Sequence, residues 1–133
     1  MKYMLDTNIL IFLIRKRPPQ VLSNFARHPL SDVCISSITV AEMEFGVARS
    51  GSTKNRLVLD GWLQLLSTPS FDEAAAHTNG PLRATLTQRG TPIGPLDTLI
   101  AAHALALDAT LVTNNVREFS RVPGLRVEDW TTP

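Results

Sequence analysis

The sequence predicts an α/β fold in which helices cover both faces of a central, mostly parallel sheet. Short apolar runs rich in β-branched residues alternate along the chain with longer segments of helical periodicity, and this alternation is typical of βαβ units. The chain has 133 residues, of which 44% are hydrophobic and 19% charged. These values are ordinary for one globular domain, so we expect a single compact domain over residues 1–133.

The first half of the chain is expected to hold two strands and three helices. Pro18 and Pro19 suit the first turn of a helix because proline lacks an amide hydrogen. Apolar residues recur at helical spacing after Thr39 and stop before Gly51. The expected elements are a strand over 2–5, a helix that follows Asp6, a helix from Pro18 to about residue 28, a strand over 33–35, and a helix from Thr39 to Ser50.

The second half is expected to hold three helices and two strands. Asn79, Gly80 and Pro81 interrupt one of the helical segments, and an internal proline removes an amide donor and crowds the preceding turn. We therefore expect a kink or a break at this point. The expected elements are helices over 53–66, 72–89 and 95–107 and strands over 110–113 and 125–127.

Two polar clusters follow expected strands directly. Asp6-Thr7-Asn8 comes after the first strand, and Thr113-Asn114-Asn115 comes after the strand at 110–113. Open parallel sheets bind ligands outside the carboxyl ends of their strands. The functional site is therefore expected where these two clusters meet.

Three acidic residues could form a metal site, although each has a purely local explanation. Asp6 fits an N-cap, Thr39 to Glu42 match a capping box, and Asp97 in a first helical turn complements the helix dipole. Glu44 points elsewhere around the helix than Glu42 does. If the three acids converged, their repulsion would call for a hard divalent cation such as Mg²⁺. The residues by themselves leave both interpretations open.

Four sequence motifs together carry a family resemblance over essentially the whole chain. In this order and spacing, the chain resembles the PIN-domain family and, within it, the VapC toxins of bacterial toxin–antitoxin pairs. The four motifs are Met4-Leu5-Asp6-Thr7-Asn8, Ile35 to Glu42 with Gly46, Gly94 to Ala101, and Leu111 to Asn115 with Glu118-Phe119.

The resemblance implies a parallel α/β/α sandwich that acts as a Mg²⁺- or Mn²⁺-dependent endoribonuclease. It implies Asp6, Glu42 and Asp97 as acidic metal ligands and catalytic residues. Asn115 stands where many relatives have a fourth acid, and Glu118 is the candidate to supply that charge. Residues expected to orient the carboxylates from behind are Asn8, Ser37 and Thr113.

The resemblance also implies partners and products. A cognate VapB-like antitoxin would hold the chain inactive, homodimers are expected, and operator DNA would be bound only through the antitoxin. Attack by water would leave a 5′-phosphate and a 3′-hydroxyl. Related toxins cut tRNA, and the anticodon stem-loop of initiator tRNA is the leading expected substrate.

The charge distribution fits an RNA substrate better than the net charge of +1 suggests. Without the three candidate ligands, nine acids oppose thirteen bases, and ten of these bases are arginines, whose planar fork suits phosphate. Candidate RNA contacts are Arg15, Lys16, Arg17 and Arg117. The alternative for residues 15–17 is a solvated helix end favoured by the dipole.

Other classes of site and location fit the sequence less well. The lysines at 2, 16 and 54 do not supply the late-strand lysine of a phosphoacceptor receiver. Residues 46–53 lack the lysine of a phosphate-binding loop. Cys34 is alone, and neither a signal peptide nor a membrane span is recognisable. We therefore expect a reducing, cytoplasmic location without membrane contact.

Two functional alternatives stay open at this stage. One is a PIN-like scaffold that binds RNA or a partner without cleavage, which the presence of Asp6, Glu42 and Asp97 argues against. The other is a structure-specific DNA nuclease. Such enzymes generally carry additional arch-like segments or domains, for which a chain of 133 residues has no room. His28, His77 and His103 show no ligand spacing and are expected at surface or packing positions.

Overall fold

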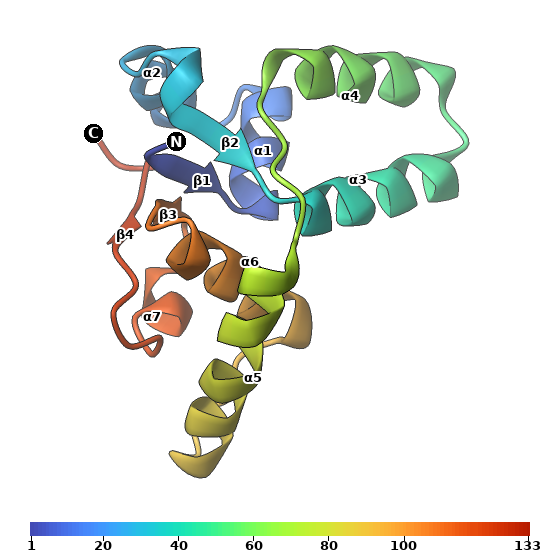
Figure 1. Cartoon of the computed structure of the whole chain (residues 1–133). Helices are drawn as coiled ribbons and strands as arrows, with labels where there is room; N and C mark the ends of the chain where they lie inside the picture. Colours follow the sequence, from blue (N-terminus) through green and yellow to red (C-terminus); the bar gives the residue numbers. More distant parts are fainter.

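A four-stranded, wholly parallel sheet of order β2-β1-β3-β4 forms the centre of the molecule (Figure 1). This computed structural model describes all 133 residues. The strands are β1 (Tyr3–Leu5), β2 (Val33–Ile35), β3 (Thr110–Val112) and β4 (Val127–Glu128). The helices are α1 (Thr7–Arg15), α2 (Pro19–Ala26), the 3-10 helix η1 (Leu30–Asp32), α3 (Ser37–Ser50), α4 (Thr53–Leu65), α5 (Glu73–Gln88), α6 (Pro95–Ala106) and α7 (Val116–Phe119).

Alternation of side chains along the short strands divides the interior into two hydrophobic cores. Met4 and Leu111 point into one core, which α5, α6 and α7 cover with residues such as Phe119. Leu5 and Val112 point into the other core, which α1 and α2 cover. Successive strand residues face opposite sides of a sheet, so helices are needed on both faces. The expected α/β/α sandwich is confirmed.

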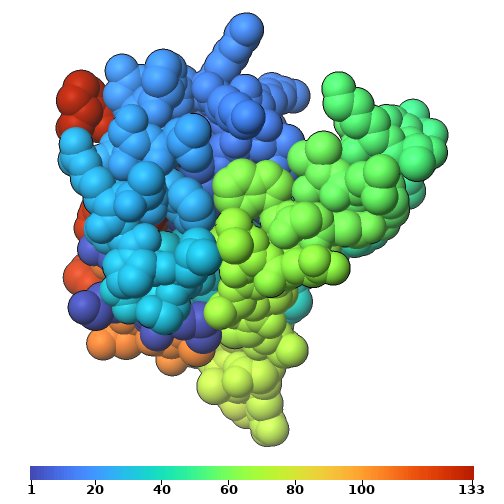
Figure 2. Space-filling model, turned by 90° about the horizontal axis from the view of Figure 1, so that it is seen from above, coloured from blue at the N-terminus to red at the C-terminus, as the bar shows by residue number.

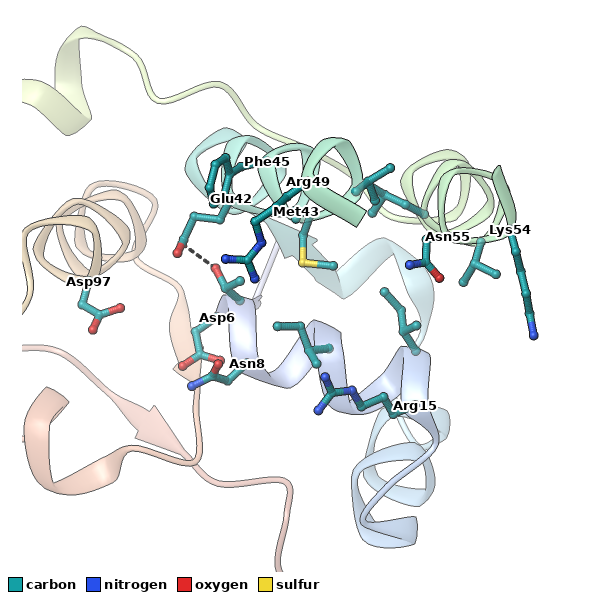
Figure 3. A pocket seen from close by; sticks show the side chains of 17 residues that line it. Asp6, Asn8, Arg15, Glu42, Met43, Phe45, Arg49, Lys54, Asn55 and Asp97 are labelled. Atoms are coloured by element: carbon teal, nitrogen blue, oxygen red, sulfur yellow. Dashed lines mark hydrogen bonds between the residues drawn. The ribbon is translucent and has the colours of Figure 1, made fainter. Parts of the chain in front are cut away.

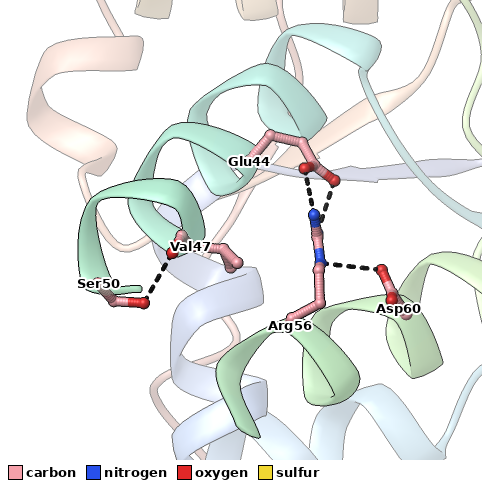
Figure 4. A network of polar contacts seen from close by, with 5 residues as sticks. All are labelled: Glu44, Val47, Ser50, Arg56 and Asp60. Carbon is pink, nitrogen blue, oxygen red and sulfur yellow. Dashed lines mark hydrogen bonds and ion pairs between the residues drawn. The ribbon is translucent and has the colours of Figure 1, made fainter. Parts of the chain in front are cut away.

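Helices α3 and α4 form a helical hairpin, residues 37–65, that stands out from the sandwich (Figures 1 and 2). Gly51 ends α3 in the left-handed conformation at φ 61°, which glycine adopts without strain. The two helices are joined by Arg56, which donates hydrogen bonds from Nη1 and Nη2 to the Glu44 carboxylate at 2.7 and 2.8 Å (Figure 4). Its Nε lies 3.3 Å from Asp60 Oδ1. Polar contacts therefore hold the hairpin where the core does not reach.

The structure corrects the expected start of the helix at Thr39. Helix α3 begins two residues earlier, and Ser36 caps it by accepting a hydrogen bond from the N–H of Ile38 at 3.0 Å. Thr39 is buried inside the first turn, so the capping-box interpretation of Thr39 and Glu42 is wrong. A serine directly after β2 satisfies the free amides first, which leaves Glu42 one turn further along the helix.

Of the kink or break expected at Pro81, the break is wrong, because α5 continues through this residue from Glu73 to Gln88. Pro81 is exposed, whereas Ala75, Leu82 and Leu86 are buried in the same helix. The packing of this apolar face against α6 offsets the hydrogen bond that the proline cannot make. The sequence showed the local penalty but not the tertiary contact.

The remaining boundaries differ from expectation by a few residues. Strand β3 ends at Val112, and β4 covers 127–128 instead of 125–127. The short helices η1 and α7 have too few residues to show a periodic pattern. No helix of the chain combines the length and the apolar character that crossing a membrane requires.

Replacement Pro81→Ala should raise the free energy of unfolding by about 2 kcal/mol, since it restores an amide donor inside α5 and removes no buried contact. Urea denaturation measures this change. The loop variant Pro92→Ala is the control and should bring no gain. Equal stability of Pro81→Ala and the wild type would contradict the account of α5.

Candidate active site

The parallel register brings the ends of three strands to one edge of the sheet. Leu5 lies opposite Ile35 on one side and opposite Val112 on the other. The residues that directly follow these strands are therefore neighbours at the carboxyl edge: Asp6, Ser36 and Thr113. All three are buried, so this edge is a preformed polar site beneath the starts of the helices.

A pocket of about 680 Å³ opens at this edge between α1, the α3–α4 hairpin and the start of α6 (Figure 3). Asp6, Glu42 and Asp97 line it together, as the family resemblance implies. Arginine and lysine side chains line it as well: Arg15, Arg49 and Lys54. The pocket thus has both an acidic and a basic part.

Asp6 is held rigidly at the junction of β1 and α1. Its carboxylate accepts a hydrogen bond from the N–H of Ile9 at 2.9 Å and so caps α1. Only 4% of Asp6 is exposed, and this burial raises the pKa of its carboxyl to about 6, against the lowering effect of hydrogen bonds from Thr113 and Ile9. The N-cap interpretation is correct, and the buried, poorly solvated carboxylate of Asp6 lines the pocket.

Glu42 is oriented by a residue that sequence analysis missed. The hydroxyl of Thr7 donates to its Oε1 at 2.7 Å and also lies 3.2 Å from the hydroxyl oxygen of Thr39. These contacts join the first turn of α1 to α3 across more than thirty residues of sequence. In the sequence, the only indication that Thr7 belongs to the site was its position next to Asp6. Glu44 is turned away toward Arg56, as expected.

Asp97 lies in the first turn of α6 and is half-buried beside Glu118. Burial raises its pKa to about 6, with further contributions from the negative charges of Glu118, Asp6 and Glu42. Glu118 accepts the N–H of Gly94 at 3.1 Å and a hydrogen bond from the side-chain amide of Asn115. A fourth carboxylate therefore stands next to Asp97 and is fixed from two sides.

The other predicted site residues are distributed unevenly around the pocket. Asn8 and Arg15 line it, and Thr113 bonds to Asp6. Ser37 instead accepts the N–H of Phe71 at 2.8 Å, so it orients the segment before α5 and no carboxylate. The exposed residues that lie outside the pocket lining are Lys16, Arg17 and Arg117.

A buried polar pair sets the position of α3 against α6. His103 Nδ1 lies 2.8 Å from the hydroxyl oxygen of Ser36, the residue that caps α3. Burial lowers the pKa of His103, which favours the neutral imidazole. Because α3 carries Glu42 and α6 carries Asp97, this pair holds two of the acids in relation to each other. The other histidines lie away from the pocket, where His28 stacks on Trp130 and His77 contacts Glu73.

The three acids of the pocket form no ion pair, although arginine and lysine side chains line the same pocket. Neither Asp6, Glu42 nor Asp97 forms an ion pair with a lysine or arginine, and burial raises the pKa of both aspartates. No group of three acids is close enough to enclose one ion by itself. Such a donor set fits a hydrated divalent cation that is held by one or two carboxylates and several waters.

Comparison with known proteins agrees with this geometry. The PIN domain family matches residues 3–125. The chain belongs to the PIN-domain family and, within it, to the VapC group. Over 131 residues, which are 98% of each chain, it is 43% identical to the tRNA(fMet)-specific endonuclease VapC of Salmonella typhimurium. The resemblance recognised in the motifs is confirmed.

Solved structures of VapBC complexes share the fold along the full length. The chain is similar to DNA-bound VapBC from Salmonella typhimurium, with a TM-score of 0.90 and 42% identity over 98% of both chains. It is also similar to VapBC2 from Rickettsia felis bound to a promoter DNA fragment, with a TM-score of 0.87, 41% identity, and 98% and 99% coverage.

Replacement Asp6→Asn should stabilise the metal-free protein at neutral pH, because asparagine keeps the N-cap but carries no buried charge. The pKa of Asp6 is about 6 instead of 3.8, so folding favours its protonated form. The stability that this preference contributes is complete below pH 3.8 and is lost as the pH rises through about 6.

The free energy of unfolding of Asp6→Asn minus that of the wild type should therefore grow by about 2 kcal/mol between roughly pH 4 and pH 7. Urea denaturation at each pH with a chelator measures this difference, in which the titration of His103 cancels. A difference that stays constant with pH would contradict the assignment.

Proposed function

We propose that this VapC-group chain is the toxin of a VapBC-type pair and a divalent-metal-dependent endoribonuclease. Its substrate is tRNA, with the anticodon stem-loop of initiator tRNA in first place. The observation that carries this proposal is the set of uncompensated carboxylates, Asp6, Glu42 and Asp97, in one pocket at the carboxyl edge of the sheet. The name of the Salmonella relative, which is similar over the whole chain, supports the choice of tRNA.

The metal of this proposal is Mg²⁺, for which Mn²⁺ can substitute. Asp6, Asp97 and Glu42 would hold it, one or two of them as direct ligands and the rest through its water ligands. Glu118 would add charge next to Asp97, either directly or through water. A bound divalent ion lowers the pKa of a water ligand and neutralises charge on the scissile phosphate. Asn115 acts through Glu118, to which it donates a hydrogen bond.

The side chains of the pocket have separate tasks in hydrolysis. Thr7 keeps the Glu42 carboxylate directed into the pocket, and Thr113 and Ile9 do the same for Asp6. A carboxylate accepts the proton of the attacking water. The new bond joins the water oxygen to phosphorus while the bond from phosphorus to O3′ breaks, and O3′ takes up a proton. The products are a 5′-phosphate and a 3′-hydroxyl.

The partners of the chain follow from the same assignment. RNA approaches past Arg15, which lines the pocket, and past the exposed residues Lys16, Arg17 and Arg117. A VapB-like antitoxin binds the toxin and links it to operator DNA, as the DNA-bound VapBC complexes of the relatives suggest. The toxin forms a homodimer that assembles further with the antitoxin.

Replacement Asp97→Asn should reduce metal-dependent cleavage by at least about 100-fold, since loss of a ligand costs no less than loss of its supporting contacts. Antitoxin-free protein is incubated with total bacterial tRNA, with Mg²⁺ or with a chelator, and the products are resolved and end-mapped. We expect discrete fragments with wild type and Mg²⁺ only.

The matched control is Glu73→Gln, which neutralises an exposed acid on α5 outside the pocket and should cleave like the wild type. Full activity of Asp97→Asn, with contaminating nuclease excluded, would refute the site assignment. Tight RNA binding by folded wild type without any cleavage would instead support a non-cleaving RNA-binding scaffold.

A further inference from the structure

Arg49 lies on the same face of α3 as the acidic residue Glu42. Seven residues separate them, which is close to two helical turns and a rise of about 10 Å. Long side chains on a helix lean toward its N-terminus, so Arg49 reaches back in the direction of Glu42. Both residues line the pocket, and Arg49 points from α3 into the space above α1 (Figure 3).

The guanidinium of Arg49 is free, although it lies in a pocket with three acids. It has no hydrogen-bond partner and no carboxylate within 4.0 Å, whereas Arg56 on the facing helix is bound to Glu44 and Asp60. The guanidinium carbon lies 5.6 Å from the centre of the Phe45 ring. A cation–π contact orients the group and leaves its five donors available.

Gly46 leaves the surface of α3 between Glu42 and Arg49 without a side chain. It is an interior helix residue that lines the pocket, and a β-carbon there would meet no atom within 4 Å. Packing therefore does not require this glycine, although glycine in a helix interior costs about 1 kcal/mol relative to alanine. Its absent side chain leaves a clear path along α3 between Glu42 and Arg49.

We infer that Arg49 is a positioning residue that binds the RNA phosphate next to the one that is cleaved. This inference rests on the proposed function. A phosphodiester chain can meet both parts of the pocket, with one phosphate at the acidic end beside the bound cation and its neighbour on the guanidinium fork of Arg49. The planar fork binds phosphate oxygens in pairs, and Phe45 fixes its direction.

The first test measures the affinity of a labelled RNA hairpin by fluorescence anisotropy in the presence of chelator at several salt concentrations. Arg49→Ala should weaken binding by about 10-fold or more and should lower the slope of log K against log salt by about one. Arg49→Lys should keep the slope and recover part of the affinity. The control Arg89→Ala, at an exposed arginine outside the pocket, should resemble wild type.

The second test locates the phosphate. Single uncharged methylphosphonates replace the linkages that flank the cleaved bond, one at a time. One of these methylphosphonates should weaken RNA binding by the wild type as much as Arg49→Ala does. The same methylphosphonate should not weaken RNA binding by Arg49→Ala any further. With Mg²⁺, Arg49→Ala should raise the KM for cleavage by about 10-fold while kcat changes less than about 2-fold.

The outcomes separate this inference from the proposed function. If wild type cleaves RNA and Arg49→Ala shows an unchanged affinity and salt slope, the role of Arg49 is overturned and the nuclease assignment stands. If wild type binds RNA without cleaving it, the proposed function fails. The affinities of wild type and Arg49→Ala for RNA with and without the methylphosphonate then decide whether Arg49 binds a phosphate. Loss of affinity for poly-glutamate but not for RNA in Arg49→Ala would overturn the inference in favour of an acidic peptide.

Discussion

Negative charge without a counter-ion is the constraint on which the rest of the site depends. The fold places Asp6 almost completely out of water and Asp97 half out of it, and the pKa of each is raised to about 6 because the charged form is poorly solvated. The other contacts of the edge serve to keep these groups in place: Ile9 and Thr113 hold Asp6, and Glu118 flanks Asp97. These contacts keep the acids in fixed positions, as the proposed cation site requires.

The sheet is small, but its parallel register makes this arrangement precise. Three strands of three residues each end level with one another, so the residues that follow them need no long loop to meet. Helices α3 and α6 are then set by the pair of Ser36 and His103. The cores on both faces hold the strands, and the polar contacts at their ends hold the acids.

The α3–α4 hairpin extends the site beyond the sandwich. Its outer part is joined by the ion pairs of Arg56, and its inner face presents both an acid and a free arginine to the same pocket. One helix thereby links the two halves of the pocket with opposite charge. A ligand that carries anionic groups at regular intervals and arrives with a cation satisfies both halves at once.

The sequence by itself determined the α/β class, the strand at 33–35, the cap at Asp6 and the family, because periodicity, capping and motif order are properties of neighbouring residues. Only the tertiary structure decided that α5 passes through Pro81. It also decided that Thr7 and Arg49 belong to the site. These features depend on contacts between helices that lie thirty or more residues apart in the chain or on burial against another element. Such contacts add free energy terms that no local pattern contains.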